Sequence, residues 1–258
     1  MRQALLVGLR GVLALSVLGS PCALRGQAGA ASSSSAQARE LLHQAVEALG
    51  GEAFLQLETQ KLQGRVYSFR QDRLTGLAPV VSYTRFPDQH REEYGKNKED
   101  IQILDGEKGW YIDIHGVKEI PPEEMRQNRV RERMSVFYIL RYRLEEPGST
   151  VQYAGRDLWG ARQVDVVHFI DRENRLAAIS LDRQSRLPVR VVWARRDERT
   201  RQRIEEVEIL ANYHREGRIM APRHYVRQRN GTKVFEAFVS EVIYNVPLPD
   251  SLFVPRPK

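Results

Sequence analysis

The sequence predicts a mainly β (α+β) protein, an antiparallel sheet of about 10–12 strands with one N-terminal helix and one inserted helix. Three observations predict this class. The hydrophobic period changes from 3.6 residues to 2 after residue 57 and stays near 2 for most of the remaining chain. The alternating segments are joined by short connections, which favour antiparallel pairing over crossover helices. No repeat and no linker divides the chain after residue 36, so residues 37–258 are expected to form a single domain.

The composition is that of an ordinary globular protein. The chain has 258 residues, of which 41% are hydrophobic and 28% are charged. These values exclude a disordered chain, a collagen and a bare coiled coil. Cys22 is the only cysteine, which excludes a disulfide framework and a multi-cysteine zinc site.

Residues 1–30 have the features of an export signal. Arg2 and Arg10 precede an uncharged stretch of fourteen residues, and the segment contains no acidic residue. A spanning helix needs about 20 apolar residues, whereas a signal-peptide core needs roughly 7–15. Ala28-Gly29-Ala30 supplies a small-x-small cleavage pattern. We therefore predict a periplasmic protein with a cleaved signal peptide, and an uncleaved anchor is the alternative.

A Ser-rich tether is expected over residues 31–36, between the export signal and the domain. Lipid attachment at Cys22 is a second alternative, but Pro21 directly before the cysteine disfavours it. Loss of the first thirty residues would remove three arginines from the net charge of +7. The excess that remains is too mild to indicate a nucleic-acid partner.

The domain is expected to open with an amphipathic helix that Gly50-Gly51 ends as a C-cap. Its apolar residues recur at helical spacing and are Leu41, Leu42, Ala45, Val46 and Leu49. Alternating segments follow, and Asp105-Gly106 and Asn230-Gly231 are hairpin turn signals among them. The expected strands are Leu62–Arg70, Val80–Phe86, Arg91–Tyr94, Ile101–Leu104, Gly109–Ile114, Thr150–Gly155, Gln163–Ile170, Arg175–Asp182, Pro188–Arg195, Arg203–Ala211, Ile219–Gln228 and Lys233–Tyr244.

One continuous helix is expected over Glu123–Glu145. Pro121-Pro122 starts it, and Glu123 and Glu124 lie in its first turn, where the helix dipole favours acidic residues. One stripe of this helix contains Val130, Met134, Phe137, Arg141 and Leu144, and all of these except Arg141 are apolar. A helix with an apolar face must cover something. A curved sheet around such a helix encloses an interior that is either filled or hollow.

Catalytic spacings are absent from the sequence. It has no nucleophile elbow, no phosphate-binding loop, no dinucleotide fingerprint and no H-E-x-x-H motif. The six histidines show no metal-ligand spacing. We therefore expect no enzyme activity, no cofactor and no metal. A hydrolase on this scaffold would need an acid, a base and a nucleophile that converge in a polar cleft.

Two sets of residues are candidates for binding. Aromatic residues in strands usually fill a core, but they could also line an apolar cavity. With the helix residues, the lipid-cavity candidates are Met134, Phe137, Tyr138, Tyr83, Trp110, Trp193, Phe235 and Phe238. Arginine clusters are usually solvated, but they could also contact lipid headgroups or an acidic partner. These candidates are Arg126, Arg129, Arg133, Arg195 and Arg196.

Three segments in this order resemble the outer-membrane lipoprotein-sorting superfamily, the LolA/LolB-like periplasmic carriers. They are ILDGEKGWYID from residue 103, SLDRQSRLPVRVVW from residue 180, and the segment from Asn212 to Pro255. The resemblance implies an open, curved antiparallel half-barrel whose helices cap the concave face. It also implies an apolar cavity that takes acyl chains. The C-terminal NVPLPDSLFVP is more similar to the broad, uncharacterised branch of the superfamily.

The resemblance implies a monomeric carrier or chaperone for lipoprotein acyl chains or another lipid. Envelope membrane proteins would then serve as donor and acceptor. On this hypothesis the inserted helix is a lid, and Met134→Asp or Phe137→Asp abolishes lipid retention while the fold survives. The alternative is a non-catalytic protein-binding or sensor module of the same fold with a filled core.

Overall fold

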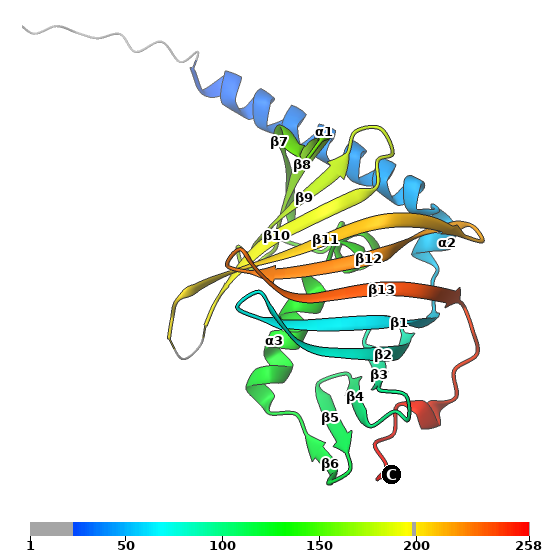
Figure 1. Ribbon diagram of the computed structural model, residues 1–258. Helices are drawn as coiled ribbons and strands as arrows, with labels where there is room; N and C mark the ends of the chain where they lie inside the picture. Colours follow the sequence, from blue (N-terminus) through cyan, green and yellow to red (C-terminus); the bar gives the residue numbers. More distant parts are fainter. Residues whose placement is uncertain (1–22, 198–199, 258) are drawn as a thin grey trace, which may run out of the picture.

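A computed structural model describes residues 23–197 and 200–257. The predicted cleavage site at residues 28–30 falls within helix α1 (Ala23–Leu49), whereas Cys22 and the uncharged core of the predicted signal lie largely outside the described residues. Within the described part, thirteen strands form one antiparallel sheet in the order β6-β5-β4-β3-β2-β1-β13-β12-β11-β10-β9-β8-β7. The sheet is strongly curved, with β6 and β7 at its two edges (Figure 1). The predicted open, curved antiparallel sheet is thus confirmed.

Each expected segment overlaps one strand, but several strands are longer than expected: β2 begins at Arg73 rather than Val80, and β11 ends at Glu216 rather than Ala211. The strands are β1 (Thr59–Arg70), β2 (Arg73–Arg85), β3 (Gln89–Tyr94), β4 (Asp100–Asp105), β5 (Lys108–Asp113), β6 (Gly116–Glu119), β7 (Thr150–Trp159), β8 (Arg162–Ile170), β9 (Leu176–Asp182), β10 (Pro188–Arg196), β11 (Arg203–Glu216), β12 (Ile219–Arg229) and β13 (Thr232–Tyr244). The short edge strand β6 was not predicted, because its four residues, GVKE, contain one apolar side chain and show no alternation.

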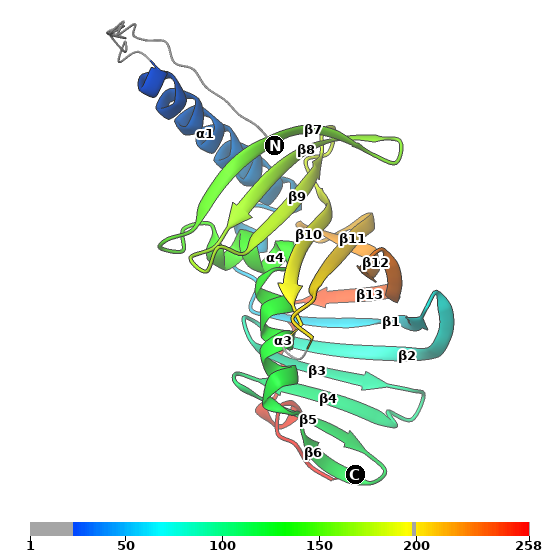
Figure 2. The same cartoon turned by 90° about the vertical axis from the view of Figure 1, so that its left-hand side faces the viewer.

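In residues 23–197 and 200–257, four helical segments accompany α1, with α4 and η1 counted as one. They are α2 (Glu52–Leu55), α3 (Pro122–Arg133), α4 (Val136–Tyr138) with the π-helix η1 (Ile139–Arg143), and the 3-10 helix η2 (Asp250–Leu252). Helix α1 packs on the β7 side of the sheet, and α3 runs along the concave side (Figure 2). Among the described helices, none combines the length and apolar character needed to cross a bilayer.

The predicted C-cap of the first helix is confirmed. Gly50 and Gly51 both have positive φ, and their backbone N–H groups donate to the carbonyl of Val46. The helix begins earlier than expected and includes the Ser-rich stretch 31–36. There the Tyr153 backbone N–H donates to Ser34 Oγ at 3.1 Å, so the expected tether is helical and bonded to β7.

The expected single helix over Glu123–Glu145 is wrong, because two helical segments occupy this range. Helix α3 ends at Arg133, and Ser135 then caps α4 by accepting the backbone N–H of Tyr138. The two segments meet different environments. Helix α3 is strongly polar, with only Met125 and Asn128 buried. The second segment buries Val136, Ile139 and Leu140 in the main core.

The interior is therefore divided into two halves. Helices α1 and α4 fill the half under β7–β10, where Leu42, Leu49 and Ile139 pack against Phe169 and Ile179. Helix α3 covers the other half, under β1–β4, β11–β13, and this half contains a cavity. The expected alternatives of a filled and a hollow interior thus each describe one half of the molecule.

The segment after β13 lies against the side of the sheet opposite to α3. Phe253 is buried there beneath the guanidinium of Arg85, 5.0 Å from the ring centroid. Arg91 on β3 donates to the Leu252 carbonyl at 3.0 Å. This proline-rich segment adds no strand to the sheet, as its sequence predicts.

Candidate functional site

The candidate site is a cavity of about 440 Å³ between α3 and the concave face of the sheet. Its volume lies within the range of about 300–1,000 Å³ that is typical of small-molecule pockets. Strands β1–β4 and β11–β13 supply one side of the cavity, Trp193 on β10 adds to it, and α3 supplies the other.

The floor of the cavity is apolar because alternate residues of neighbouring strands face the same side. Val66, Val80 and Ala237 pack together as a buried cluster at its centre. Gly64 lies at a β-bulge, where an added Cβ would come within 2.3 Å of the Phe238 carbonyl oxygen. The apolar residues of the floor are Leu62, Val66, Val80, Leu104, Phe235, Ala237 and Val239.

The roof of the cavity is polar. One face of α3, continuing into the turn after it, presents Asn128, Arg131, Glu132 and Ser135. Arg131 Nη2 donates to Asn128 Oδ1 at 2.7 Å, whereas the buried Asn128 Nδ2 has no hydrogen-bond partner in the described part of the chain. His90 Nε2 on β3 lies 2.5 Å from Glu132 Oε1 and links the sheet to the helix.

Two arginines face each other across the cavity, Arg131 from α3 and Arg227 from β12. Burial lowers the pKa of the Arg131 guanidinium to about 10, and the positive charge of Arg227 adds to this effect. The Arg227 guanidinium stacks over the Phe235 ring, 4.3 Å from its centroid. Within the described residues, no carboxylate oxygen lies within 4.0 Å of either guanidinium.

Acidic side chains also reach this cavity. Burial raises the pKa of Glu208 on β11, although Arg227 and Arg131 act against the shift. Glu92 accepts a hydrogen bond from the Tyr94 hydroxyl. Burial, with the charge of Glu92, raises the pKa of that hydroxyl. No group of three or more His, Cys, Asp or Glu residues in the described ranges is placed to hold a metal ion.

Glu206 on β11 lines the part of the cavity that is near the start of α3. Its Oε1 accepts hydrogen bonds from Arg195 Nε and Arg229 Nε, each at 3.1 Å. A second hollow of about 470 Å³ adjoins the cavity here and shares Asn128 and Arg131 with it. The two hollows give the cavity a charged opening beside Glu206.

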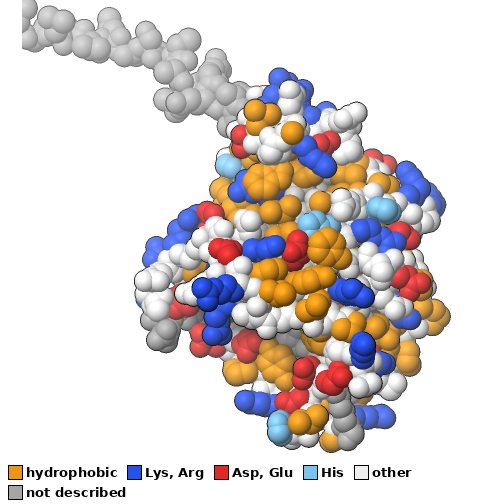
Figure 3. Space-filling view, in the orientation of Figure 1, with side chains coloured by type: hydrophobic (Ala, Val, Ile, Leu, Met, Phe, Trp, Pro, Cys, Tyr) orange, Lys and Arg blue, Asp and Glu red, His pale blue; other side chains and the backbone are white. Residues whose placement is uncertain are grey.

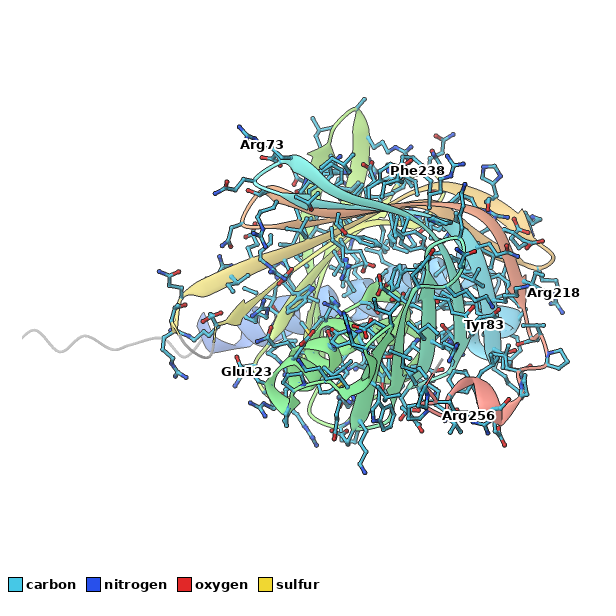
Figure 4. All side chains as sticks on the ribbon, turned by 60° about the horizontal axis from the view of Figure 1, so that its bottom comes forward. Arg73, Tyr83, Glu123, Arg218, Phe238 and Arg256 are labelled. Atoms are coloured by element: carbon cyan, nitrogen blue, oxygen red, sulfur yellow. The ribbon has the colours of Figure 1, made fainter. Side chains whose placement is uncertain are left out.

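Three of the eight aromatic and apolar candidates, Trp193, Phe235 and Phe238, occur along the cavity wall. The ring of Phe238, however, lies on the convex face, stacked on His224 at 4.5 Å and labelled in Figure 4. Tyr83 follows the cavity-lining Ser82 on β2 and so points to the opposite face. Trp110 packs against the separate cluster that contains Ile103.

The remaining candidates belong to the segment after α3. Met134 has no exposed surface and lies in the main core. Phe137 packs edge-on against Phe54, with ring centroids 6.0 Å apart, and Tyr138 packs against Tyr142 at 4.9 Å. The break after Arg133 explains this placement, because it directs the second segment away from the cavity.

None of the five predicted arginines lines the cavity. Arg129 pairs with Glu107 at 3.4 Å and Arg133 with Glu146 at 2.7 Å. Arg195 lies at the opening with Glu206, and Arg126 and Arg196 are exposed. The two arginines that face the cavity, Arg131 and Arg227, are not among the five candidates. The alternation Tyr225-Val226-Arg227 places Arg227 on one face with Tyr225, but it does not say that this face is concave.

Apolar side chains also reach the surface elsewhere. A wider cleft of about 1160 Å³ lies between α2, η1 and the adjacent ends of β12 and β13. Arg141 fills part of it and stacks over Phe86 and Tyr142, at 4.2 and 4.8 Å. On the face shown in Figure 3, apolar side chains are interspersed with charged ones. Phe238 and Ile243 are among the large apolar side chains that are exposed.

Comparison with known proteins finds similarity in structure alone. No family model matches the sequence, and no curated protein is detectably similar to it. An outer-membrane lipoprotein-sorting protein domain from Vibrio parahaemolyticus is similar in structure, with a TM-score of 0.54 and 12% identity. A LolA superfamily protein from Nitrosomonas europaea has a TM-score of 0.53 and 10% identity. Each alignment covers 84% of this chain and 97% of the other chain.

A DUF1329 family protein from Desulfovibrio piger is similar to the same extent, with a TM-score of 0.54, 10% identity and the same coverage of both chains. At this level of identity the similarity concerns the fold. The resemblance to the LolA-like superfamily is thus confirmed as a shared architecture, the open and curved half-barrel with helices on its concave side.

Proposed function

We propose that this protein is an exported carrier that holds the acyl chain of a lipid or lipoprotein in the cavity under α3. The observation that carries the proposal is the continuous apolar floor formed by β1, β2 and β13 beneath a separate helical roof. Burial of a chain on this floor gains about 0.8 kcal/mol per CH₂ group. The similarity in fold to an outer-membrane lipoprotein-sorting protein domain and to a LolA superfamily protein supports the proposal.

Release of the chain requires a wall that moves, and α3 is suited to this role. Its contacts with the sheet include polar ones, among them His90 with Glu132 and Tyr111 with Glu124. The segment after it is anchored by apolar burial of Val136 and Ile139. Polar contacts exchange readily with water and contribute little net stability, whereas core packing does not. We therefore assign the lid to α3 alone.

Native mass spectrometry of the protein purified from a bacterial periplasm tests this function. We expect co-purifying mass in the range of an acyl chain or a phospholipid, which is lost on denaturation and identified by lipid extraction. A mass of the protein alone, unchanged after incubation with lipid and lipopeptide, would contradict the carrier. That result would favour a protein-binding module. The filled half under α1 and α4 is consistent with such a module.

A further inference from the structure

The cavity contains guanidinium groups whose hydrogen-bonding capacity is mostly unused. Arg131 donates to Asn128, and Arg227 stacks over Phe235, but neither forms an ion pair within the described residues. Arginine is rarely buried without a partner, because removing its charge from water is costly unless an anion or hydrogen bonds compensate for it.

Several other partly or fully buried arginines of the fold have acidic partners. Arg143 pairs with Asp171 at 3.0 Å, and Arg195 pairs with Glu206 at 3.1 Å. Arg141 and Arg190 have no acidic partner in the described residues either, but they stack over Phe86 and Trp159, which do not line this cavity. Arg131 and Arg227 are the ones that face the cavity. These two guanidinium groups could therefore bind an anion inside the cavity, beside its apolar floor.

The acidic residues near the cavity do not pair with these two guanidinium groups. Glu92 accepts the Tyr94 hydroxyl, and Glu206 is shared by Arg195 and Arg229. Glu208 makes no hydrogen bond within the described part of the chain, and burial shifts it toward its neutral form. The buried Nδ2 of Asn128 is a further donor without an acceptor. Donors on both walls of the cavity are thus available to a ligand.

We propose that Arg131 and Arg227 bind the anionic group of an amphiphile, a carboxylate or a phosphate, whose acyl chain lies on the floor formed by β1, β2 and β13. This inference rests on the proposed function and names its ligand class. The planar guanidinium offers paired N–H donors that match both anions. The Phe235 ring beneath Arg227 holds that guanidinium in place, so little side-chain freedom remains to be lost on binding.

Three ligands of equal chain length distinguish the effect of the head-group charge on affinity from the effect of the alkyl chain. They are palmitate, palmitoyl lysophosphatidylglycerol and the neutral hexadecanol, each competing with the neutral fluorescent probe N-phenyl-1-naphthylamine for the full chain. We expect the anionic ligands to displace the probe at lower concentration than hexadecanol. The tighter of the two anionic ligands identifies the head as carboxylate or phosphate.

Variants then assign the effect to the two arginines. Arg227→Gln and Arg131→Gln should each weaken the preferred anionic ligand by about ten- to a hundredfold, the size of a charged hydrogen bond, and leave hexadecanol unchanged. Arg215→Gln is the control, because this arginine is exposed on the neighbouring strand β11 and lines neither hollow, so the affinity for each ligand should stay at the wild-type value. Thermal unfolding and near-ultraviolet circular dichroism verify that each variant is folded.

The outcomes distinguish this inference from the function on which it rests. Equal affinity for hexadecanol and for both anionic ligands, or an anion affinity that survives both substitutions, would overturn the anion subsite and leave the carrier intact. Failure of the wild-type chain to bind the probe and all three ligands would overturn both. If inorganic phosphate displaces the probe and the anionic amphiphiles do not, the site binds the free anion, and the proposal that its ligand is an amphiphile is overturned.

Discussion

The guanidinium of Arg143 and the carboxylate of Asp171 form an ion pair of 3.0 Å, with side chains that are 2% and 0% exposed. The pair joins the π-helix η1 to the turn between β8 and β9. Arg143 also donates to the Arg133 carbonyl at 2.9 Å and stacks over Phe169. This interaction fixes the segment after α3 in the core and leaves α3 outside it.

Removal of the carboxylate should destabilise the protein strongly. In Asp171→Ala, Arg143 keeps its charge inside the core with Glu146, at 2.6 Å, as its remaining acidic partner, and we expect the free energy of unfolding to fall by about 3 kcal/mol in urea titrations. Arg39→Met, which breaks an exposed pair with Glu145, is the control and should cost at most about 1 kcal/mol. Equal losses in the two variants would contradict a stabilising role for the buried pair.

The stability of the protein should fall in acid through Asp171. Burial acts to raise the pKa of this carboxyl, but hydrogen bonds from Arg175 and Arg143 outweigh it and lower the pKa below 3.8. Its contribution is therefore complete above pH 3.8 and lost as the pH falls through the lower folded value. Between about pH 6 and about pH 3, wild type should lose more unfolding free energy than Asp171→Asn. Parallel losses would show that other carboxyls dominate.

Filling the cavity from its floor should prevent lipid retention. Ala237 is buried and lines the cavity, so the indole of Ala237→Trp would occupy the space of the acyl chain. Ser240→Trp on the same strand is the control, since Ser240 is exposed on the other face. Lipid extracted per mole of folded protein should fall sharply in the first variant and stay at the wild-type amount in the second. Full lipid content in folded Ala237→Trp would place the ligand elsewhere.

Met134→Asp should unfold the protein rather than empty its cavity. Met134 has no exposed surface, and a carboxylate there would be buried among apolar side chains, at a cost of several kcal/mol. Leu158→Asp, at a position that is 67% exposed, should change the stability little. Circular dichroism and urea titration measure both. A folded Met134→Asp variant without lipid would instead restore Met134 to the lid.

Local pattern accounts for what could be predicted. The alternation in β8 and β13 and the turn Asn230-Gly231 act between residues that are near in sequence, so strands and hairpins could be located from them. The break after Arg133 could not, because the stripe through Val130 and Met134 suits a straight helix. Burial of Arg143 against a distant carboxylate favours the broken form.

The sequence by itself determined the class of fold, the leading helix with its C-cap and the succession of antiparallel strands, since each depends on local propensity and periodicity. Only the tertiary structure decided which face of each strand is concave. It also decided that Phe235 and Arg227 line the cavity while the ring of Phe238 lies outside it. The physical reason is that alternation defines two faces but does not orient them. The curvature of the whole sheet and the position of α3 make one face the interior.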